Sequence, residues 1–167
     1  MTSAVSAVVR ASHTRLALTS VALMLALADL GIKTLATSTL ADGPNVDLGV
    51  LELRLAYNPG VAFSLGDTLP SAIVIAATAL IIAGIGVLAW RTAPTTPLLG
   101  RTGLAAILGG AAANLVDRAM DGVVTDYLHT GWWPTFNLAD VFITCGGALV
   151  VLVHLRSPAG DREEVAT

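Results

Sequence analysis

Charged residues are scarce in this chain of 167 residues. Asp, Glu, Lys and Arg together make up 13%, against roughly 25% in an ordinary soluble domain. Hydrophobic residues make up 54%, and the mean hydropathy is +0.76. Intrinsic disorder needs high charge and low hydrophobicity, so this composition excludes it. The chain is also too short for a multidomain assembly. A membrane protein is the class that fits.

Other absences exclude further classes. The single cysteine, Cys145, excludes an internal disulfide and a CxxC metal or redox pair. The three histidines are scattered without metal-ligand spacing, and no HExxH occurs, so we expect no metal and no other cofactor. The formal net charge is −3 and the pI is near 5.4. Without a basic patch, nothing predicts nucleic-acid binding.

Four apolar stretches are long enough to cross a bilayer, which takes roughly 20 residues per helix. They cover residues 16–36, 71–90, 98–116 and 136–155. We therefore predict an all-α membrane protein, a single integral membrane domain over residues 1–167 with four transmembrane helices and a polar tail, 156–167. A cleaved signal peptide is the alternative for the first stretch, because Arg10 and Arg15 precede its apolar core. Asp29 and Lys33, which follow that core at once, argue against this alternative.

The arginines predict the orientation. Six lie before the first stretch, between the second and third, near the start of the third, or after the fourth: Arg10, Arg15, Arg91, Arg101, Arg156 and Arg162. The other two connections hold only Arg54 and Arg118. Because positive residues favour the cytoplasm, we predict that both termini are cytoplasmic. Residues 37–70 and 117–135 are then extracytoplasmic.

The first outer connection has a pattern of its own. Leucine or tyrosine occupies every second position of residues 51–57, which predicts a half-buried strand. Asn58-Pro59-Gly60 ends this strand with turn residues. A strand beside the membrane suits a flap over a substrate, and a loop packed on its own helices fits the pattern equally well.

Polar residues gather on the predicted outer side: Asp29, Asn58, Asn114, Asp117, Arg118, Asp126, Asn137 and Asp140. Ionisable residues in or beside membrane spans are costly and often functional. Simpler roles stay open for each. Asn137 and Asp140 fit a helix N-cap. Asp29 and Lys33, four residues apart, fit a neutralising pair. Asp117 with Arg118 fits a solvated surface pair, and Asp126 an ordinary loop aspartate.

Two neighbouring carboxylates that share one proton are the machinery of an aspartic protease. Asp140, in the first turn of the last predicted span, is favoured as the anion. Asp126, in a loop with apolar neighbours, is favoured as the protonated partner. A transporter or channel is an alternative, but it should spread ionisable groups across the membrane depth. A non-catalytic scaffold is another, and it would tolerate asparagine at both positions.

At these residues the sequence resembles the bacterial lipoprotein signal peptidases (signal peptidase II). Five segments are similar to family motifs, in order: residues 29–33 to DxxxK, 58–63 to NxGxAF, 109–118 to GGxxGNxxDR, 122–127 to GxVxDF/Y and 134–140 to FPxFNxAD. The similarity covers roughly residues 16–155. Two positions depart from the motifs: Ala113 replaces a glycine and Trp133 replaces a phenylalanine. From its position alone, Trp133 is predicted to lie in the interfacial aromatic belt.

The resemblance implies an aspartic endopeptidase of the bacterial cytoplasmic membrane with Asp126 and Asp140 as its catalytic pair. It implies supporting or substrate-binding roles for Asn58, Gly60, Asn114, Asp117, Arg118, Asn137, Asp29 and Lys33. Residues 37–70 resemble the family's extracytoplasmic β-cradle. The implied substrates are prolipoproteins with a diacylglyceryl-modified cysteine, cleaved just before it. Membrane lipid and globomycin-type inhibitors are the other implied partners.

Overall fold

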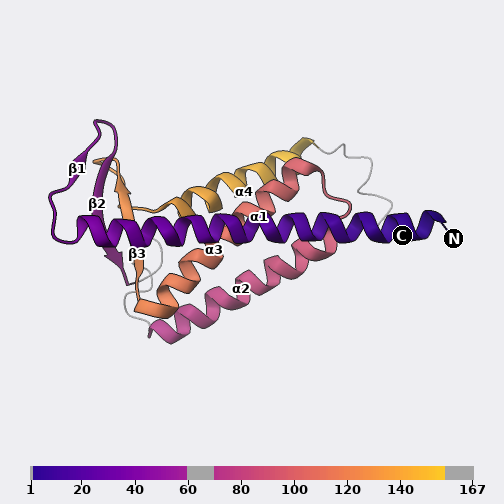
Figure 1. Ribbon diagram of the computed structural model, residues 1–167, viewed down its shortest axis with the longest axis horizontal. Coiled ribbons are helices and arrows are strands. Elements are labelled where there is room, and N and C mark those ends of the chain that lie inside the picture. The colour runs from indigo at the N-terminus through magenta and orange to yellow at the C-terminus, as the bar shows by residue number, and fades with distance from the viewer. Residues whose placement is uncertain (1, 60–69, 157–167) are drawn as a thin grey trace.

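The computed structural model describes residues 2–59 and 70–156 (Figure 1). Its helices are α1 (Thr2–Leu40), α2 (Ser71–Thr92), α3 (Leu98–Asp121) and α4 (Leu138–Arg156), and its strands are β1 (Val46–Asp47), β2 (Glu52–Asn58) and β3 (Val124–His129). Within these ranges, four helices are long and apolar enough to cross a membrane. The predicted class, four membrane helices with a small sheet, is confirmed. Gly60 and the tail 157–167 lie outside the described residues.

Two helices are longer than the apolar stretches that predicted them. α1 begins at Thr2 rather than near residue 16, because the polar residues before that point include no proline or glycine to stop a helix. α3 continues to Asp121 and ends where Gly122 adopts a left-handed backbone with φ 78°. Asp117 and Arg118 therefore belong to a helix and not to the outer connection.

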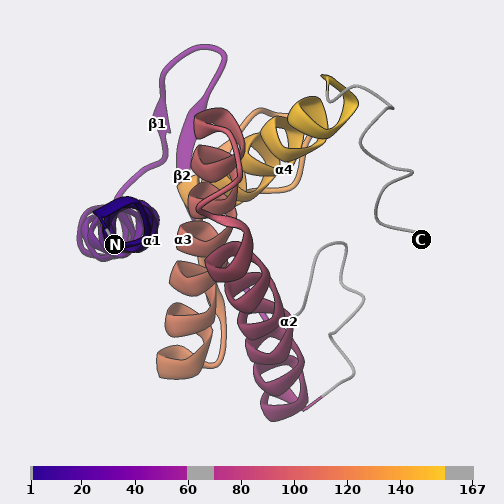
Figure 2. The ribbon, with the colours of Figure 1, turned by 90° about the vertical axis from the view of Figure 1, so that its right-hand side faces the viewer.

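α3 is the central helix, with α1 on one side and α2 and α4 on the other (Figure 2). Glycines allow the close approach. A Cβ atom at Gly109 would lie 2.6 Å from the Ala22 carbonyl oxygen of α1, and one at Gly103 would lie 2.7 Å from the Gly146 carbonyl oxygen of α4. Small residues are what lets membrane helices pack at this distance.

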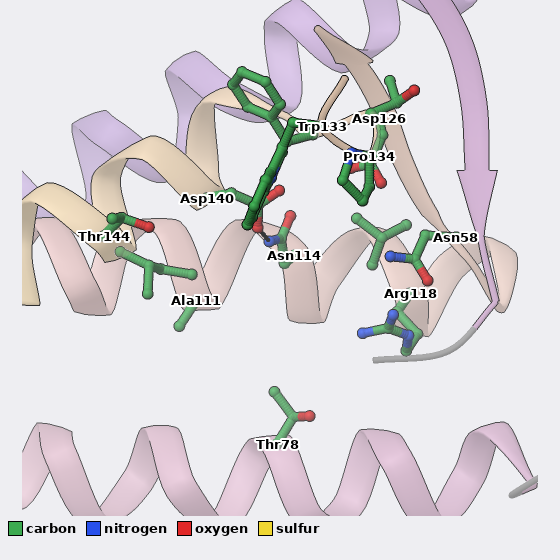
Figure 3. A pocket seen from close by; sticks show the side chains of 14 residues that line it. Asn58, Thr78, Ala111, Asn114, Arg118, Asp126, Trp133, Pro134, Asp140 and Thr144 are labelled. Atoms are coloured by element: carbon green, nitrogen blue, oxygen red, sulfur yellow. Dashed lines mark hydrogen bonds between the residues drawn. The ribbon is translucent and has the colours of Figure 1, made fainter. Parts of the chain in front are cut away.

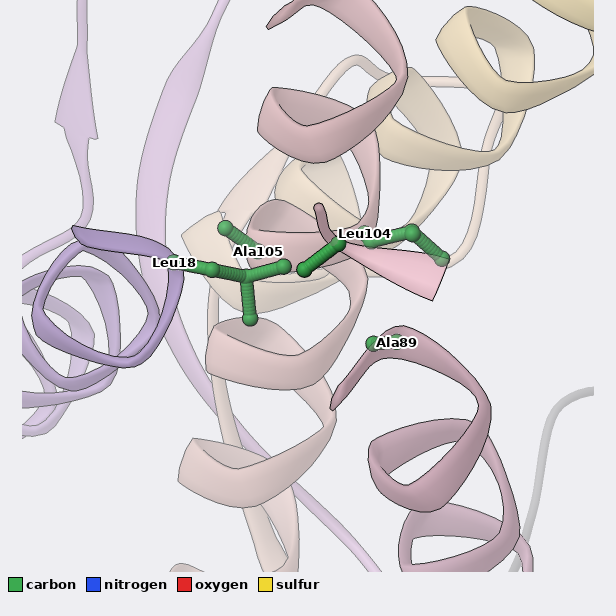
Figure 4. Packing of buried hydrophobic residues seen from close by; sticks show 5 residues of the cluster. Leu18, Ala89, Leu104 and Ala105 are labelled. Carbon is green, nitrogen blue, oxygen red and sulfur yellow. The ribbon is translucent and has the colours of Figure 1, made fainter. Parts of the chain in front are cut away.

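Small and apolar side chains fill the contacts around α3. One cluster of Leu18, Ala89, Leu104 and Ala105 joins α1, α2 and α3 (Figure 4). A second cluster contains Ala113, the alanine that replaces a glycine of the signal peptidase II motif. Ala113 is fully buried against Ala26 of α1 and Ala139 of α4. The extra methyl group is therefore accommodated by the packing just before Asn114.

The three strands form an antiparallel sheet in the order β1-β2-β3, across the end of the bundle where α1 ends and α4 begins (Figure 1). β2 is the predicted strand. β3 was not predicted, because five of its six residues are buried and it lacks the alternation of a half-buried strand. Asp126 lies on β3, so its assignment to a loop is wrong. The register pairs Asn58 with Val124 and Ala56 with Asp126.

Candidate active site

A buried ammonium group connects α1 to α3. Lys33 is 3% exposed, and its Nζ lies 3.1 Å from Asp29 Oδ2 and 3.1 Å from Asp117 Oδ2. It also donates a hydrogen bond of 2.6 Å to Asn114 Oδ1. The neutralising pair expected from the spacing of Asp29 and Lys33 is therefore present, but within a larger network. Buried charges persist where they are paired and hydrogen-bonded in this way.

The start of α4 is held by side chains from other elements. The first N–H groups of a helix have no partner inside the helix, and a site beside lipid offers little water to replace one. Leu138 N donates to the Tyr127 hydroxyl of β3 at 3.1 Å, and Ala139 N donates to Asp29 Oδ1 of α1 at 3.0 Å. Tyr127 in turn donates to Asp29 Oδ1 at 3.3 Å. Burial raises the pKa of Tyr127, so its hydroxyl keeps the proton that it donates.

The carboxylate of Asp140 is fixed through both oxygens. Asn137 N donates to Oδ2 at 3.1 Å, and Asp140 N donates back to Asn137 Oδ1 at 3.0 Å, so the predicted N-cap is present. Asn114 Nδ2 donates to Oδ1 at 2.9 Å. Donors of this kind stabilise a carboxylate anion.

Asp126 is 4% exposed, which excludes an ordinary loop aspartate. Asn137 Nδ2 donates to its Oδ1 at 2.6 Å, and the Asn58 side chain also hydrogen-bonds with it. Burial, followed by the negative charge of Asp140, raises the pKa of Asp126 to about 7. The hydrogen bonds from Asn137 and Asn58 and the charge of Lys33 limit that rise. Asp126 therefore exchanges its proton near neutral pH.

Asn137 connects the two carboxyl groups. Its side-chain amide donates to Asp126 and its backbone N–H donates to Asp140, while its exposed fraction is 0%. Its Nδ2 also lies 3.1 Å from Asn114 Oδ1. Two acids from different elements, β3 and α4, are therefore held on either side of one buried residue.

Asp117 and Arg118 are each 6% exposed, so the solvated surface pair is wrong. Asp117 Oδ2 accepts a hydrogen bond of 2.7 Å from Thr125 N, which ties α3 to the start of β3. Arg118 lies within electrostatic reach of Asp126, Asp117 and Asp140. One buried cation on α1 and one on α3 therefore face the same group of acids.

A pocket of about 410 Å³ opens onto the two acids (Figure 3). Its polar lining comes from Asn58, Asn114, Arg118, Asp126 and Asp140, and its apolar lining includes Ala111, Val124, Trp133, Phe136 and Ile143. Thr78 projects from α2 across from α3 and α4 (Figure 3). The pocket therefore lies among three helices and the sheet, and its lining mixes polar and apolar side chains.

Nine of the ten site residues predicted from the sequence gather in this network and pocket; Gly60 is not described. Trp133 lines the pocket, which its assignment to the aromatic belt did not predict. Thr78 and Tyr127 were missed as well. One threonine in a long apolar run carries no signal of where it points. The hydroxyl of Tyr127 matters only through tertiary contacts.

Within residues 2–59 and 70–156, no group of three or more His, Cys, Asp or Glu side chains is arranged to hold a metal ion.

The chain is similar to known proteins in sequence and in fold. The profile of the family described as signal peptidase (SPase) II matches residues 21–156. The lipoprotein signal peptidases of Brucella ovis and Brucella melitensis are each 41% identical over 137 residues, covering 79% of this chain and 85% of theirs. A solved bacterial membrane enzyme superposes with a TM-score of 0.74 at 22% identity, covering 86% of this chain and 90% of its own. This chain therefore belongs to the signal peptidase II family.

Proposed function

We propose that this chain is a membrane aspartic endopeptidase that removes signal peptides from prolipoproteins, with Asp126 and Asp140 as its catalytic pair. Membership of the signal peptidase II family and the curated relatives named lipoprotein signal peptidase support the activity. The observation that carries the assignment of the pair is Asn137, which hydrogen-bonds to both carboxyl groups beside the pocket.

The two acids have different surroundings, and these suggest different roles. Asp140 accepts donors at both oxygens and sits in the first turn of α4, which favours an anion. It is the general base that takes a proton from the attacking water. Asp126, with a pKa raised to about 7 by burial and the nearby carboxylate, is the protonated partner. It donates a hydrogen bond to the carbonyl oxygen of the scissile peptide bond.

Water adds to the carbonyl carbon to give a tetrahedral intermediate. The proton held by Asp140 then passes to the leaving nitrogen as the C–N bond breaks, and Asp126 recovers the proton it shared with the oxygen. The products are a signal peptide with a new carboxyl group and a mature chain with a free amino group. Asn58, Asn114 and Asn137 orient the acids, and Arg118 lies on the pocket wall where a substrate carbonyl can accept its N–H groups.

The pocket suits a substrate that stays in the membrane. Its lining comes from α2, α3, α4 and the sheet, so a peptide can approach from the lipid between helices. We propose that cleavage occurs just before a diacylglyceryl-modified cysteine, whose acyl chains remain in lipid. Each methylene kept there contributes about 0.8 kcal/mol, so no charged clamp for the lipid is needed. Globomycin-type cyclic peptides are the inhibitors that we expect to occupy the same pocket.

We further propose that both termini are cytoplasmic and that the sheet and pocket lie at the extracytoplasmic face. Support comes from the arginine distribution, since Arg15, Arg91, Arg101 and Arg156 belong to the helix ends away from the sheet. Reporter fusions after Ala93 should report cytoplasm and fusions after Asp42 the outside. The reverse pattern would place the acids on the wrong face.

The deciding experiment uses purified full-length protein in detergent and a diacylglyceryl-modified prolipoprotein. We expect release of the signal peptide by the wild type and none by Asp126→Asn or Asp140→Asn, because asparagine keeps the shape but cannot exchange the proton. Thermal unfolding checks that both variants fold. An inactive wild type on several such substrates would reject the activity. Full activity of either variant would reject the assignment of the pair.

A further inference from the structure

A second pocket, of about 180 Å³, lies between α1 and α3 at the end of the bundle away from the sheet. Its polar lining comes from Thr14, Arg101 and Thr102. Its apolar lining comes from Leu98 at the start of α3 and, farther from the helix ends, from Ala17, Leu18, Val21 and Ala105. Thr14 and Val21 are two helical turns apart, about 10 Å along α1. All three polar groups therefore lie in the half of the groove near the helix ends, and the half toward the middle of the spans is apolar, as the two parts of a phospholipid require.

Arg101 lines this groove and is partly buried. Its Nε is buried and has no hydrogen-bond partner among the described residues. A buried donor in a folded protein normally has a partner. Because Arg101 as a whole is only partly buried and lines the groove, an anion in the groove can reach its terminal N–H groups. Arg15, at the same end, is satisfied within the protein, because it donates to the Trp90 carbonyl oxygen at 3.0 Å and stacks on the indole ring.

The ends of α1 and α3 near the groove carry positive charge and no negative charge. The sequence contains no Asp or Glu in residues 1–28, 68–116 or 141–160, which supply the helix ends away from the sheet. The same segments carry Arg10, Arg15, Arg91, Arg101 and Arg156. An anion from outside the described chain would complement this end of the bundle.

We propose that this groove binds one anionic phospholipid, with its phosphate at Arg101 and Thr102 and an acyl chain along Leu18 and Val21. Arginine presents a planar set of N–H donors that matches phosphate oxygens. Basic pockets between membrane helices are a known setting for acidic head groups. The site is separate from the peptidase pocket, since the two share no lining residue. The proposal rests on the membrane helices and not on the catalytic pair.

The test uses full-length protein in nanodiscs or mixed micelles, with retained lipid counted by native mass spectrometry. Wild type should bind phosphatidylglycerol about five-fold more tightly than phosphatidylcholine, the factor expected for one arginine at a membrane surface. Arg101→Gln should abolish this preference and Arg101→Lys should keep most of it. Arg91→Gln is the matched control, because Arg91 is exposed at the same end and lines neither pocket.

Ala17→Trp provides an independent variant if Arg101→Gln unfolds, because Ala17 is exposed and lines the groove. A bulky ring there should displace the lipid with Arg101 intact. The proposal would be overturned if both Arg101→Gln and Ala17→Trp kept the full preference for phosphatidylglycerol. It would also be overturned if Arg91→Gln lost as much of that preference as Arg101→Gln does.

Two other occupants are outcomes of the same experiment. Displacement of the lipid by inorganic phosphate at similar concentration would mean that the site takes phosphate alone. The acidic residues Asp161, Glu163 and Glu164 belong to the tail outside the described residues. If wild type shows no preference for phosphatidylglycerol and neutralising these three residues creates one, the tail occupies the groove at Arg101. Either result overturns the lipid assignment.

Discussion

Lys33 reaches Asp140 through a single side chain. Its Nζ lies 2.6 Å from Asn114 Oδ1, and Asn114 Nδ2 lies 2.9 Å from Asp140 Oδ1. A hydrogen bond accepted from an ammonium group polarises the amide, which then donates more strongly to the carboxylate. The buried ion network that packs α1 against α3 is therefore continuous with the proposed catalytic base.

Lys33→Met should be strongly destabilising. It would leave Asp29 and Asp117 buried without their shared cation, and breaking a buried ion pair on one side costs about 3–5 kcal/mol. Denaturant unfolding in detergent measures the change. Adding Asp29→Asn and Asp117→Asn to the same chain should restore at least half of the loss, because no buried charge then remains unpaired. No recovery in the triple variant would contradict this account.

Asn137→Ala should lower kcat by roughly 10²–10³-fold, the loss typical when one preorganised donor is removed from an active site. The variant also loses the cap on Asp140 N, which should reduce stability by about 1 kcal/mol. The matched control is Asn45→Ala, which removes an exposed amide that donates to Glu52 outside the pocket. Similar kcat values for the two variants would mean that Asn137 only caps the helix.

The pH dependence of kcat/KM should have a basic limb with an apparent pKa of about 7, the value to which burial and Asp140 raise Asp126. Activity should fall above this pH, because the proposed acid then loses its proton. Asn58→Ala should move the limb to higher pH, since the bond from Asn58 lowers the pKa of Asp126. A limb that moves to lower pH in this variant would reject Asp126 as the acid.

The same raised pKa predicts a trend in stability. Because the folded state holds the Asp126 proton more tightly than the unfolded chain does, this group contributes most below pH 4. Its contribution decreases as the pH rises to about 7 and is constant above that. Asp126→Asn removes the effect, so the stability of the variant relative to wild type should increase from pH 4 to pH 8. Parallel thermal unfolding curves across this range would contradict the assignment.

Neighbouring glycines of α4 should respond differently to a methyl group. A Cβ atom at Gly146 would lie 2.6 Å from the Gly103 carbonyl oxygen, whereas one at Gly147 meets nothing within 4 Å. Gly146→Ala should therefore push α4 from α3 and cost about 1–3 kcal/mol by overpacking. Gly147→Ala should be neutral or stabilising by up to about 1 kcal/mol, since alanine favours a helix. Equal unfolding temperatures would contradict the close contact.

Much of this architecture could be predicted from the sequence, because burial in lipid leaves long apolar runs that are easy to recognise. The strand over residues 52–58 was predicted because leucine or tyrosine alternates with other residues in its sequence. In the structure its residues are intermediate in burial on both faces, except for the exposed Tyr57. β3 was not predicted, since strand burial on both faces removes that alternation. Helix ends were missed for a related reason: hydropathy identifies a span, whereas α1 and α3 extend into polar residues.

The sequence predicted which residues form the site, but not the hydrogen bonds and ion pairs that join them. Motif order brought Asp126, Asp140 and their asparagines together as candidates. Two of these contacts are the ion pair of Lys33 with Asp117 and the hydrogen bond from Leu138 N to the Tyr127 hydroxyl. Both depend on how α1, α3 and β3 pack together, and no local sequence pattern encodes that packing. The polar groups were predicted individually as caps, pairs or loop residues, and several of them also serve the shared network.

α2 supplies Thr78 to the pocket, while the hydrogen bonds and ion pairs given above for the acid network come from α1, α3, α4, the two strands β2 and β3, and Asn137 just before α4. Near its other end, Ala89 packs with Leu18 and the Trp90 carbonyl oxygen accepts from Arg15. A change in the position of α2 at the pocket would therefore break none of the hydrogen bonds and ion pairs given above for the two aspartates.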